Sequence, residues 1–358
     1  MSELPLRTLE FRNITLPSGA RLARLELAWT LRGRPRSDGS NIVLGFHSLT
    51  GLPDLASWWP GLVGEGRLLD PGELALLTPV LLGSCHGTRV LGKEDSVSPS
   101  GPGDEPLRLP VDPGPLPPGL TPRDQAWLTG QLLDRIGIGR VALALGGSLG
   151  GMVALEWAAT FPERTDVVIS FAAPAAQPAQ ALAFNQIQRE AIRLGGFPAG
   201  LALARKAAMI TYRTAGEFES RFSRERTDDG RFQMESYLDH QGEKLAARFL
   251  PASYLALMGA MDRHDVGAGR RGGVRGALGA FRGHLVGVGI PGDLLYPDRE
   301  VQRWVAEAGA LYRRIDSARG HDGFLLEEEQ VEAILSEGLG LAEAARAESV
   351  PAHAGGEA

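Results

Sequence analysis

The run Gly146-Gly147-Ser148-Leu149-Gly150 constrains this chain more than any other stretch. It follows the apolar run 141–145 and precedes residues 151–157, whose composition predicts a helix. A Gly-x-Ser-x-Gly motif between a strand and a helix is typical of a nucleophile elbow. Glycines beside the serine let strand and helix approach closely, and the helix N-terminus offers positive charge to an oxyanion. We therefore predict that Ser148 is a nucleophile, although a Gly-Ser pair can also form an ordinary turn.

Strands and helices are expected to alternate along the rest of the chain. Residues 6–32 alternate loosely between apolar and polar and predict an antiparallel pair. Short apolar runs predict buried strands at 41–46, 74–82 and 166–171. Features of a parallel sheet resume at 284–290, and a last strand is expected around 311–315. A capping threonine followed by proline, Thr121-Pro122, predicts the start of a helix. This alternation indicates an α/β fold with a doubly wound, mostly parallel sheet.

The chain is expected to divide into a core and an inserted lid. Residues 176–275 carry helix-forming residues and no convincing strand, which predicts a helical lid insertion over a site. The core would then consist of residues 1–175 and 276–341. The Pro- and Gly-rich residues 93–120 are expected to form a surface loop, and residues 342–358 a disordered tail.

Composition excludes several classes of function. The net charge of −6 offers no basic surface for nucleic acid or an anionic membrane. One cysteine, Cys85, cannot form an intramolecular disulfide and suits a reducing compartment, where burial in the core is its usual role. The first residues do not resemble a signal peptide, and no apolar run reaches the roughly 18 residues of a membrane span. Together these features lead us to expect a cytoplasmic protein. Because the sequence has no His-x-x-His or Cys-x-x-Cys pair, we also expect that it binds no metal.

Three chemically matched residues follow predicted strands. Ligands of open parallel sheets bind beyond the carboxyl ends of the strands, where Ser148, Asp293 and His321 are expected. The order Ser, Asp, His is that of α/β-hydrolases. Ser148 would attack a carbonyl, His321 would accept its proton, and Asp293 would fix the histidine tautomer. Taken singly, an aspartate at the position of Asp293 is more often a turn former or helix cap, and a histidine like His321 is more often part of a surface or structural pair.

An oxyanion formed at this serine needs two N–H donors. One would come from Leu149, the residue after the nucleophile, and the other from the loop His47–Gly51, with Leu49 as its donor. Asp298 is the nearest rival to Asp293. The remaining histidines fit the role of the base less well: His86, His240, His264, His284 and His353.

Many ordered motifs of residues 40–330 resemble those of the homoserine O-acetyltransferase family, acyltransferases with the α/β-hydrolase fold. Besides residues 146–152 and Ala154-Leu155-Glu156-Trp157, they lie at residues 47–51, 58–62, 66–70, 83–88, 203–205, 210–213, 236–244, 260–265, 293–297 and 321–325.

This resemblance implies a reaction in two steps. Ser148 would take an acetyl group from acetyl-CoA, a substrate and not a cofactor, and pass it to L-homoserine on the way to methionine. Arg205 would hold the carboxylate of the amino acid with Tyr212 nearby, and Asp322 would hold its ammonium group. A cation and an anion suit a zwitterion, although Arg205 could also be an ordinary solvated helix residue. The family resemblance further implies a homodimer formed through lid helices.

The chain departs from the family pattern at a few positions. Ser48 and Gly323 stand where alanine is usual, Arg89-Val90-Leu91 replaces the usual Thr-Gly-Pro, and the segment between Gln186 and Gly200 is short. We expect these departures near the mouth of the pocket. They leave open succinyl-CoA as donor, serine as acceptor, or a plain esterase. A binding protein without catalysis is the remaining alternative, and it would not need the three residues Ser148, Asp293 and His321.

Overall fold

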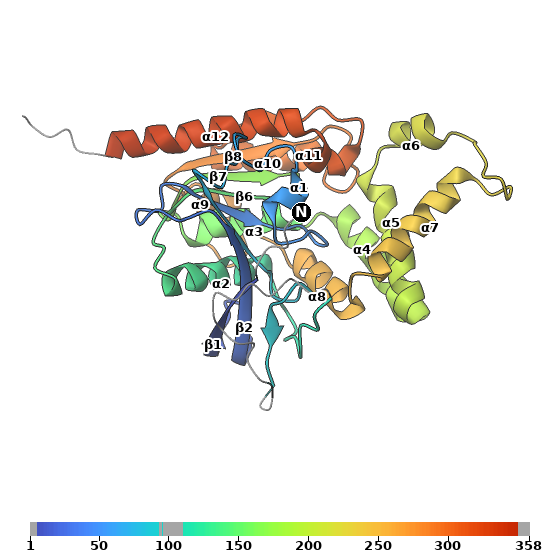
Figure 1. Cartoon of the computed structure of the whole chain (residues 1–358), viewed down its shortest axis with the longest axis horizontal. Coiled ribbons are helices and arrows are strands. Elements are labelled where there is room, and N and C mark those ends of the chain that lie inside the picture. Colours follow the sequence, from blue (N-terminus) through green and yellow to red (C-terminus); the bar gives the residue numbers. More distant parts are fainter. Residues whose placement is uncertain (1–5, 93–94, 96–109, 350–358) are drawn as a thin grey trace, which may run out of the picture.

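A computed structural model describes residues 6–92, 95 and 110–349 of the chain. Its strands form one nine-stranded sheet (Figure 1). The strands are β1 (Arg7–Thr15), β2 (Arg21–Arg32), β3 (Ile42–Phe46), β4 (Ala75–Pro79), β5 (Arg89–Val90), β6 (Val141–Gly147), β7 (Thr165–Phe171), β8 (His284–Gly289) and β9 (Leu311–Arg314).

The sheet is mostly parallel, as the sequence predicts. Its order is β1-β2-β4-β3-β6-β7-β8-β9, with β5 paired to β2. The pairs from β4 through β9 are parallel, whereas β2 pairs antiparallel with β1, β4 and β5. Strand β3 lies between β4 and β6, so the chain adds β4 on one side of β3 and the later strands β6 to β9 on the other. The carboxyl ends of β3 and β6 therefore lie at a topological switch point, where ligands of such sheets bind.

Helices cover both faces of this sheet. The helices of the described residues are α1 (Leu55–Trp58), α2 (Pro122–Arg135), α3 (Leu149–Thr160), α4 (Ala179–Gly195), α5 (Leu201–Tyr212), α6 (Ala215–Phe222), α7 (Gln233–Ala246), α8 (Pro251–Asp262), α9 (Gly273–Leu278), α10 (Asp298–Ala308), α11 (Gly323–Leu326) and α12 (Glu328–Ser349). Short turns of other helix types are η1 (Gly196–Gly200) and η2 (Gly320–Asp322). Helices α2, α3, α9 and α10 share one face, and α1 and α12 pack on the other.

Helix α2 begins where its capping residues predict. The side chain of Thr121 accepts the N–H of Asp124, and the Asp124 carboxylate accepts the N–H of Thr121 at 2.8 Å. This reciprocal pair satisfies two N–H groups that a helix start leaves without partners. Residues 110–120 before it are described and contain neither helix nor strand, whereas 93–94 and 96–109 of the predicted loop lie outside the described residues.

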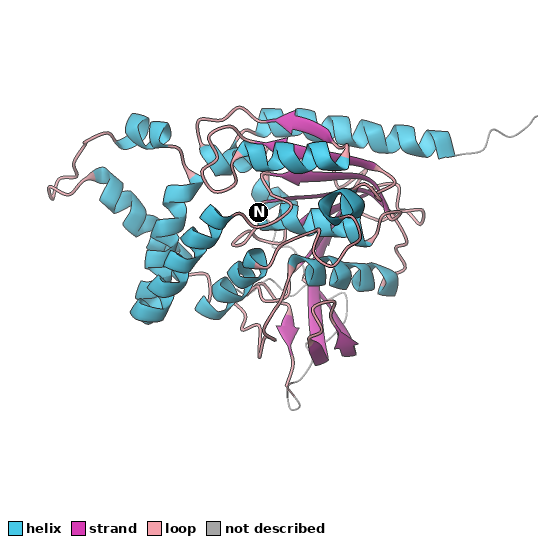
Figure 2. Cartoon of the chain, turned by 180° about the vertical axis from the view of Figure 1, so that it is seen from behind, coloured by secondary structure: helices cyan, strands magenta, loops and turns pink. Residues whose placement is uncertain are grey.

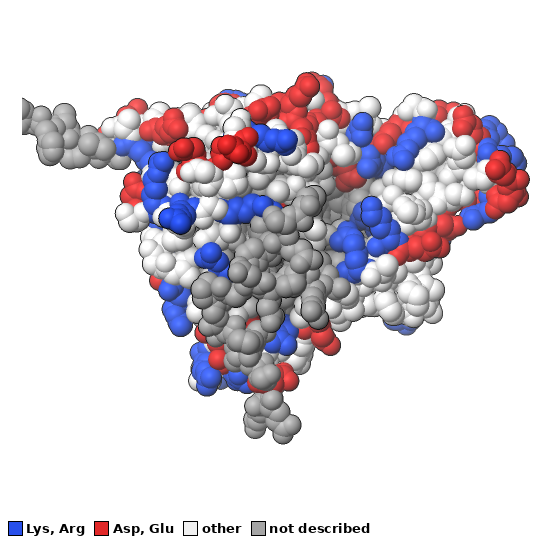
Figure 3. Space-filling model, viewed as in Figure 1, with Lys and Arg blue, Asp and Glu red and all other residues white. Residues whose placement is uncertain are grey.

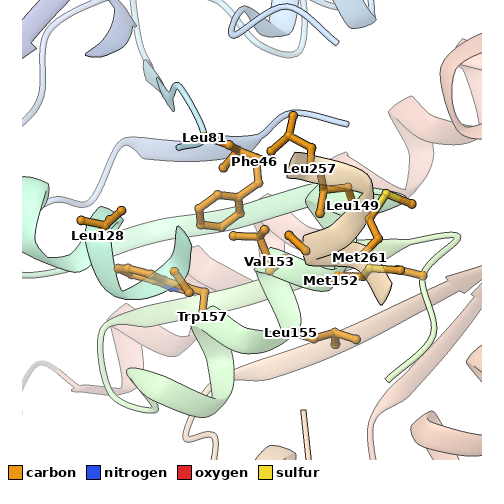
Figure 4. Packing of buried hydrophobic residues seen from close by; sticks show 14 of the residues in the cluster. Phe46, Leu81, Leu128, Leu149, Met152, Val153, Leu155, Trp157, Leu257 and Met261 are labelled. Carbon is orange, nitrogen blue, oxygen red and sulfur yellow. The ribbon is translucent and has the colours of Figure 1, made fainter. Parts of the chain in front are cut away.

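The insertion after β7 is helical, as expected, but its helices differ in position. Helices α4, α5, α6 and α7, here called the lid helices, project to one side of the sheet (Figures 1 and 2). Helix α8 lies between the lid helices and the sheet: it contacts α4, and its Leu257 and Met261 are buried in the same cluster as Leu149 and Met152 of α3 (Figures 1 and 4). Burial of such side chains stabilises the fold by roughly 1.5–3 kcal/mol each.

The expectation of a disordered tail from residue 342 is wrong for residues 342–349. Helix α12 runs to Ser349, and Ala342 is buried against the sheet. Arg346 forms an ion pair with the buried Asp166 of β7. Alanine and glutamate in this stretch favour a helix, and only one side of this helix packs against the rest of the protein. Residues 350–358 of the predicted tail lie outside the described residues. Within the described part of the chain, no helix is long and apolar enough to cross a membrane.

Candidate active site

The turn between β6 and α3 has the strained conformation that the sequence predicts for an elbow. Ser148 has φ 57° and ψ −123°, a conformation that residues with a side chain rarely adopt. The Ser148 N–H donates to Phe171 O at 2.9 Å, and Ser148 O accepts the N–H of Met152. The turn is therefore held by the neighbouring strand and by the first turn of α3.

Two glycines of the motif are required by close backbone contacts. A Cβ atom on Gly146 would lie 2.3 Å from the carbonyl of Gly150, and one on Gly150 would lie 1.9 Å from Phe46 O. Atoms cannot approach this closely, so any side chain at these positions would separate β6, α3 and the end of β3. The sequence argument for these glycines is thus confirmed in physical detail.

Asp293 and His321 are in direct contact beyond the ends of β8 and β9. His321 Nδ1 lies 2.7 Å from Asp293 Oδ2, and both side chains are almost fully buried. Asp293 Oδ1 accepts the N–H groups of Leu295 and Tyr296 at 2.8 and 2.9 Å. These bonds hold the carboxylate in one orientation and fix the edge of the imidazole that faces it.

The surroundings of His321 influence its pKa in opposite directions. Burial alone would lower the pKa, but the charge of Asp293 and its hydrogen bond outweigh burial and raise the pKa above 6.5. Tyr212, Tyr296 and Phe324 place their rings 5.4 to 5.7 Å from the imidazole. These aromatic rings restrict the orientation of His321 and the access of water to it.

A cavity of about 650 Å³ brings the predicted residues together. Ser148 and His321 both line it, and so do Leu49, Arg205, Tyr212 and Asp322. Leu149 is fully buried at the start of α3 beneath the serine. Among the described residues Ser148 Oγ makes no hydrogen bond to His321, a contact that is commonly long in the absence of substrate.

The lid helices contribute positive charge to this cavity. Arg205 of α5, Lys244 of α7 and Arg248 line it, and within the described residues none of the three has an ion-pair partner. In Figure 3, lysine and arginine side chains gather in the hollow between the sheet and the lid helices. The Arg205 guanidinium carbon lies 5.2 Å from the centre of the Tyr212 ring, and burial raises the pKa of Tyr212.

Asp322 already has a partner that the sequence did not indicate. Arg213 Nη2 lies 3.1 Å from Asp322 Oδ2, while Arg213 Nη1 donates to Glu217 Oε1 at 2.9 Å. Burial raises the pKa of Asp322 although Arg213, His321 and Arg205 act in the other direction. The motif 210–213 contains Arg213, but its partner lies more than 100 positions away in the chain, so spacing could not reveal the pair.

The rival residues have other environments. Asp298 accepts the hydroxyl of Tyr312 at 2.6 Å at the start of α10. Of the other histidines, His86 and His264 are buried, His240 and His284 are exposed, and none of these four lines the cavity; His353 lies outside the described residues. Cys85 is buried, as expected, and its burial raises the pKa of the thiol. No cluster of three or more metal-ligating side chains occurs in the described part of the chain.

The expectation that all departures lie near the pocket mouth is wrong. Ser48 lines the cavity. Arg89 and Val90 instead form β5 against β2, where Arg89 pairs with Glu26. At Gly323 a Cβ atom would lie 2.8 Å from Ser317 Cβ, so an alanine there would require Ser317 to shift.

Comparison with known proteins supports the assignment of the fold. Residues 111–253 match the family model of the alpha/beta hydrolase fold. A solved structure, acetyl esterase MekB, has a TM-score of 0.76 at 21% identity, with 94% of this chain and 97% of that one covered. Because an esterase shares the fold, the fold alone does not select the reaction.

Sequence relatives are more specific. The homoserine O-acetyltransferase of Thermus thermophilus is 41% identical, with 88% of this chain and 86% of the relative covered. The solved homoserine O-acetyltransferase of Staphylococcus aureus is 28% identical, with a TM-score of 0.75 and 93% of this chain and 94% of that one covered. This chain belongs to the homoserine O-acetyltransferase family, whose members are enzymes of the α/β-hydrolase fold.

Proposed function

We propose that this enzyme transfers an acetyl group from acetyl-CoA to the hydroxyl of L-homoserine through an acetyl-Ser148 intermediate, as a step of methionine biosynthesis. The observation that carries the proposal is a single cavity that joins the strained Ser148, the buried Asp293–His321 pair and Arg205, which has no ion-pair partner among the described residues. The first two features serve acyl transfer, and the third suits an amino acid as acceptor.

In the first step His321 Nε2 takes the proton of Ser148 as its oxygen attacks the thioester carbonyl. The N–H groups of Leu49 and Leu149 stabilise the oxyanion, and the positive end of α3 adds to them. Collapse of this intermediate breaks the C–S bond, and the departing thiolate takes the proton from His321. Asp293 stabilises the imidazolium throughout, without itself being protonated.

In the second step the homoserine hydroxyl replaces the thiol. His321 removes its proton while the oxygen attacks the acetyl carbonyl, and the same proton returns to Ser148 as the ester leaves. Arg205 holds the carboxylate of homoserine, and Tyr212 packs beside it. Arg213 engages Asp322 Oδ2, so Oδ1 of Asp322 would accept the ammonium group.

The lid helices would favour acyl transfer to homoserine over hydrolysis of the acyl-enzyme by water. Arg205 and Tyr212 of α5 and Lys244 of α7 line the cavity, and these side chains would limit the access of water to the acyl-enzyme. Lys244 and Arg248 add positive charge that favours a phosphate-bearing donor such as acetyl-CoA.

We propose further that the enzyme is a cytoplasmic homodimer, joined through the lid helices. Large apolar side chains are exposed on these helices and on η1, with Ile187 59%, Leu194 78%, Phe197 59% and Leu203 53% exposed. Ile187 and Leu194 lie seven residues apart and so share a face of α4. Monomers rarely expose such a set, and a second copy would cover it. Leu194→Asp should convert a dimer to a monomer in light scattering, whereas a monomeric wild type would contradict this part of the proposal.

The function is tested by incubating the purified protein with acetyl-CoA, with and without homoserine. We expect rapid thiol release only when homoserine is present, with O-acetylhomoserine as product. Equal release without homoserine would indicate an esterase or thioesterase. Equal or faster turnover with succinyl-CoA, or with serine in place of homoserine, would overturn the assignment of the donor or the acceptor.

The role of Arg205 is tested by separating the two steps. Arg205→Ala should raise KM for homoserine strongly while Ser148 is still acetylated by acetyl-CoA, because only the acceptor needs the guanidinium. Arg205→Lys serves as the control, since it keeps the charge but not the two parallel hydrogen bonds. Loss of the acetylation step itself would remove Arg205 from the acceptor site.

A further inference from the structure

The peptide unit between Ser48 and Leu49 is held from its carbonyl side. Ser48 O lies 2.8 Å from His47 Nδ1 and accepts the N–H of Gly51 at 3.1 Å. A peptide unit is planar and trans, so its C=O and N–H point in opposite directions. Bonds that hold the oxygen of Ser48 therefore also fix the direction of the N–H of Leu49.

The partners of His47 determine which ring nitrogen carries the hydrogen. The N–H of Leu81 points at His47 Nε2 at 3.1 Å, so this nitrogen must be the acceptor. Nδ1 therefore carries the hydrogen of the neutral ring and donates it to Ser48 O. The side chain is fully buried, and burial lowers the pKa of His47 to about 4, so the neutral form prevails at physiological pH.

His47 thereby joins two neighbouring strand ends to the loop at the cavity. It follows β3 directly, while Leu81 follows β4, its parallel neighbour. From the lid side, Arg248 Nη1 donates to Thr50 O at 3.0 Å. The carbonyls of Ser48 and Thr50, on either side of Leu49, are thus engaged by the side chains of His47 and Arg248. Of the two, only the carbonyl of Ser48 shares a peptide unit with the N–H of Leu49.

We propose that His47 is a positioning residue for the oxyanion hole: its Nδ1–H, held in one tautomer by Leu81, aims the N–H of Leu49 into the cavity beside Ser148. This inference rests on the proposed function only in that Leu49 is taken as an oxyanion donor. His47 touches no reacting atom. Its effect is to remove the reorientation that a free peptide would undergo in the transition state.

Two variants separate the hydrogen bonds of the ring. The amide nitrogen of His47→Asn occupies the place of Nδ1 and can still donate to Ser48 O, but leaves Leu81 without an acceptor. The longer His47→Gln brings its amide end to the place of Nε2 and can still accept from Leu81, but leaves Ser48 O without its side-chain donor. A purely structural role would make activity follow the loss of thermal stability in both variants.

The readout is the acetylation of Ser148 by p-nitrophenyl acetate, which needs the oxyanion hole but neither CoA nor homoserine. We expect His47→Gln to lower kcat about 10- to 100-fold, below the roughly 10²- to 10³-fold cost of losing a whole oxyanion donor, with KM little changed. His47→Asn should retain kcat within about threefold, as expected when the donor to Ser48 remains. Equal losses in the two variants, or a wild-type kcat in His47→Gln, would overturn the proposal.

A matched control is available next to this ring. The His86 ring lies 5.7 Å from that of His47, is equally buried, and neither of its nitrogens has a hydrogen-bond partner among the described residues. His86→Leu should change stability without changing kcat. A wild-type enzyme that hydrolyses the nitrophenyl ester but does not acetylate homoserine would contradict the proposed function and leave the comparison at His47 intact.

A measurement on the unmodified protein covers the case in which the variants do not fold. Nitrogen-15 spectra of histidine should show His47 neutral at pH 7 with its hydrogen on Nδ1. Finding the hydrogen on Nε2, or a protonated ring, would overturn the proposal without any substitution.

Discussion

His321 Nδ1 and Asp293 Oδ2 lie 2.7 Å apart, and the second oxygen of the same carboxylate is occupied by two backbone N–H groups. The carboxylate therefore cannot rotate away from the imidazole. This arrangement leaves Nε2 of His321 as the only ring nitrogen that can exchange a proton with Ser148.

Replacement of Asp293 by asparagine should reveal this dependence. Asp293→Asn keeps the size of the side chain, but its amide can donate to Nδ1 and thus favour the wrong tautomer. We expect kcat to fall about 10³- to 10⁴-fold with KM for both substrates little changed. Steady-state kinetics on a variant of unchanged circular dichroism spectrum would measure this, and a loss of less than tenfold would show that Asp293 does not orient the base.

The pH dependence of activity should follow the raised pKa of His321. Only the neutral imidazole can accept the proton of Ser148, so kcat/KM should rise with pH through a pKa above 6.5.

The contribution of His321 to the free energy of unfolding should change in the opposite direction and fall as pH rises. A group whose pKa is higher in the folded state stabilises the fold fully below its unfolded pKa, and this contribution is lost as pH rises through the folded pKa. In Asp293→Asn the kinetic pKa should fall, and an unchanged value would contradict the charge effect assigned to Asp293.

The strained backbone of Ser148 predicts a trade-off between stability and activity. Ser148→Ala and Ser148→Gly should both lower kcat about 10⁴-fold or more, because the nucleophile is lost. Only glycine relieves the positive φ of 57°, a conformation that costs roughly 1–3 kcal/mol in other residues. We therefore expect Ser148→Gly to be about 1 kcal/mol more stable than Ser148→Ala in chemical unfolding, after the entropy of glycine is deducted. Equal stabilities would mean that the turn stores no strain at this residue.

The sequence predicted well those features that depend on neighbouring residues. The apolar runs, the Thr121 cap and the elbow glycines act within a few positions of the chain, and each appears where expected. The sequence does not predict the extension of α12, because the Ala- and Glu-rich residues 342–349 have too few apolar side chains to indicate burial. Arg346 of this stretch forms an ion pair with Asp166, a contact that only the folded chain brings together.

The same distinction applies to the site. Order along the chain sufficed to select Ser148, Asp293 and His321, since parallel strands present their carboxyl ends at one edge. It could not show that Arg213 pairs with Asp322, that His47 accepts a bond from Leu81, or that α8 shares a buried cluster with α3. These relations are set by packing between segments that no local pattern links.

The ion pair between Arg213 and Asp322 gives a last prediction, because it joins the lid to the loop that carries His321. Both side chains are largely buried, with 13% and 18% of their surface exposed, so removing one partner leaves a charge poorly solvated. Arg213→Met should lower the free energy of unfolding by about 2–3 kcal/mol, less than the 3–5 kcal/mol of a fully buried pair. It should also raise the pKa of Asp322 further and weaken homoserine binding as pH falls. Asp322→Asn should reduce the cost of Arg213→Met in a double-mutant cycle, and additive effects would show that the two side chains do not interact.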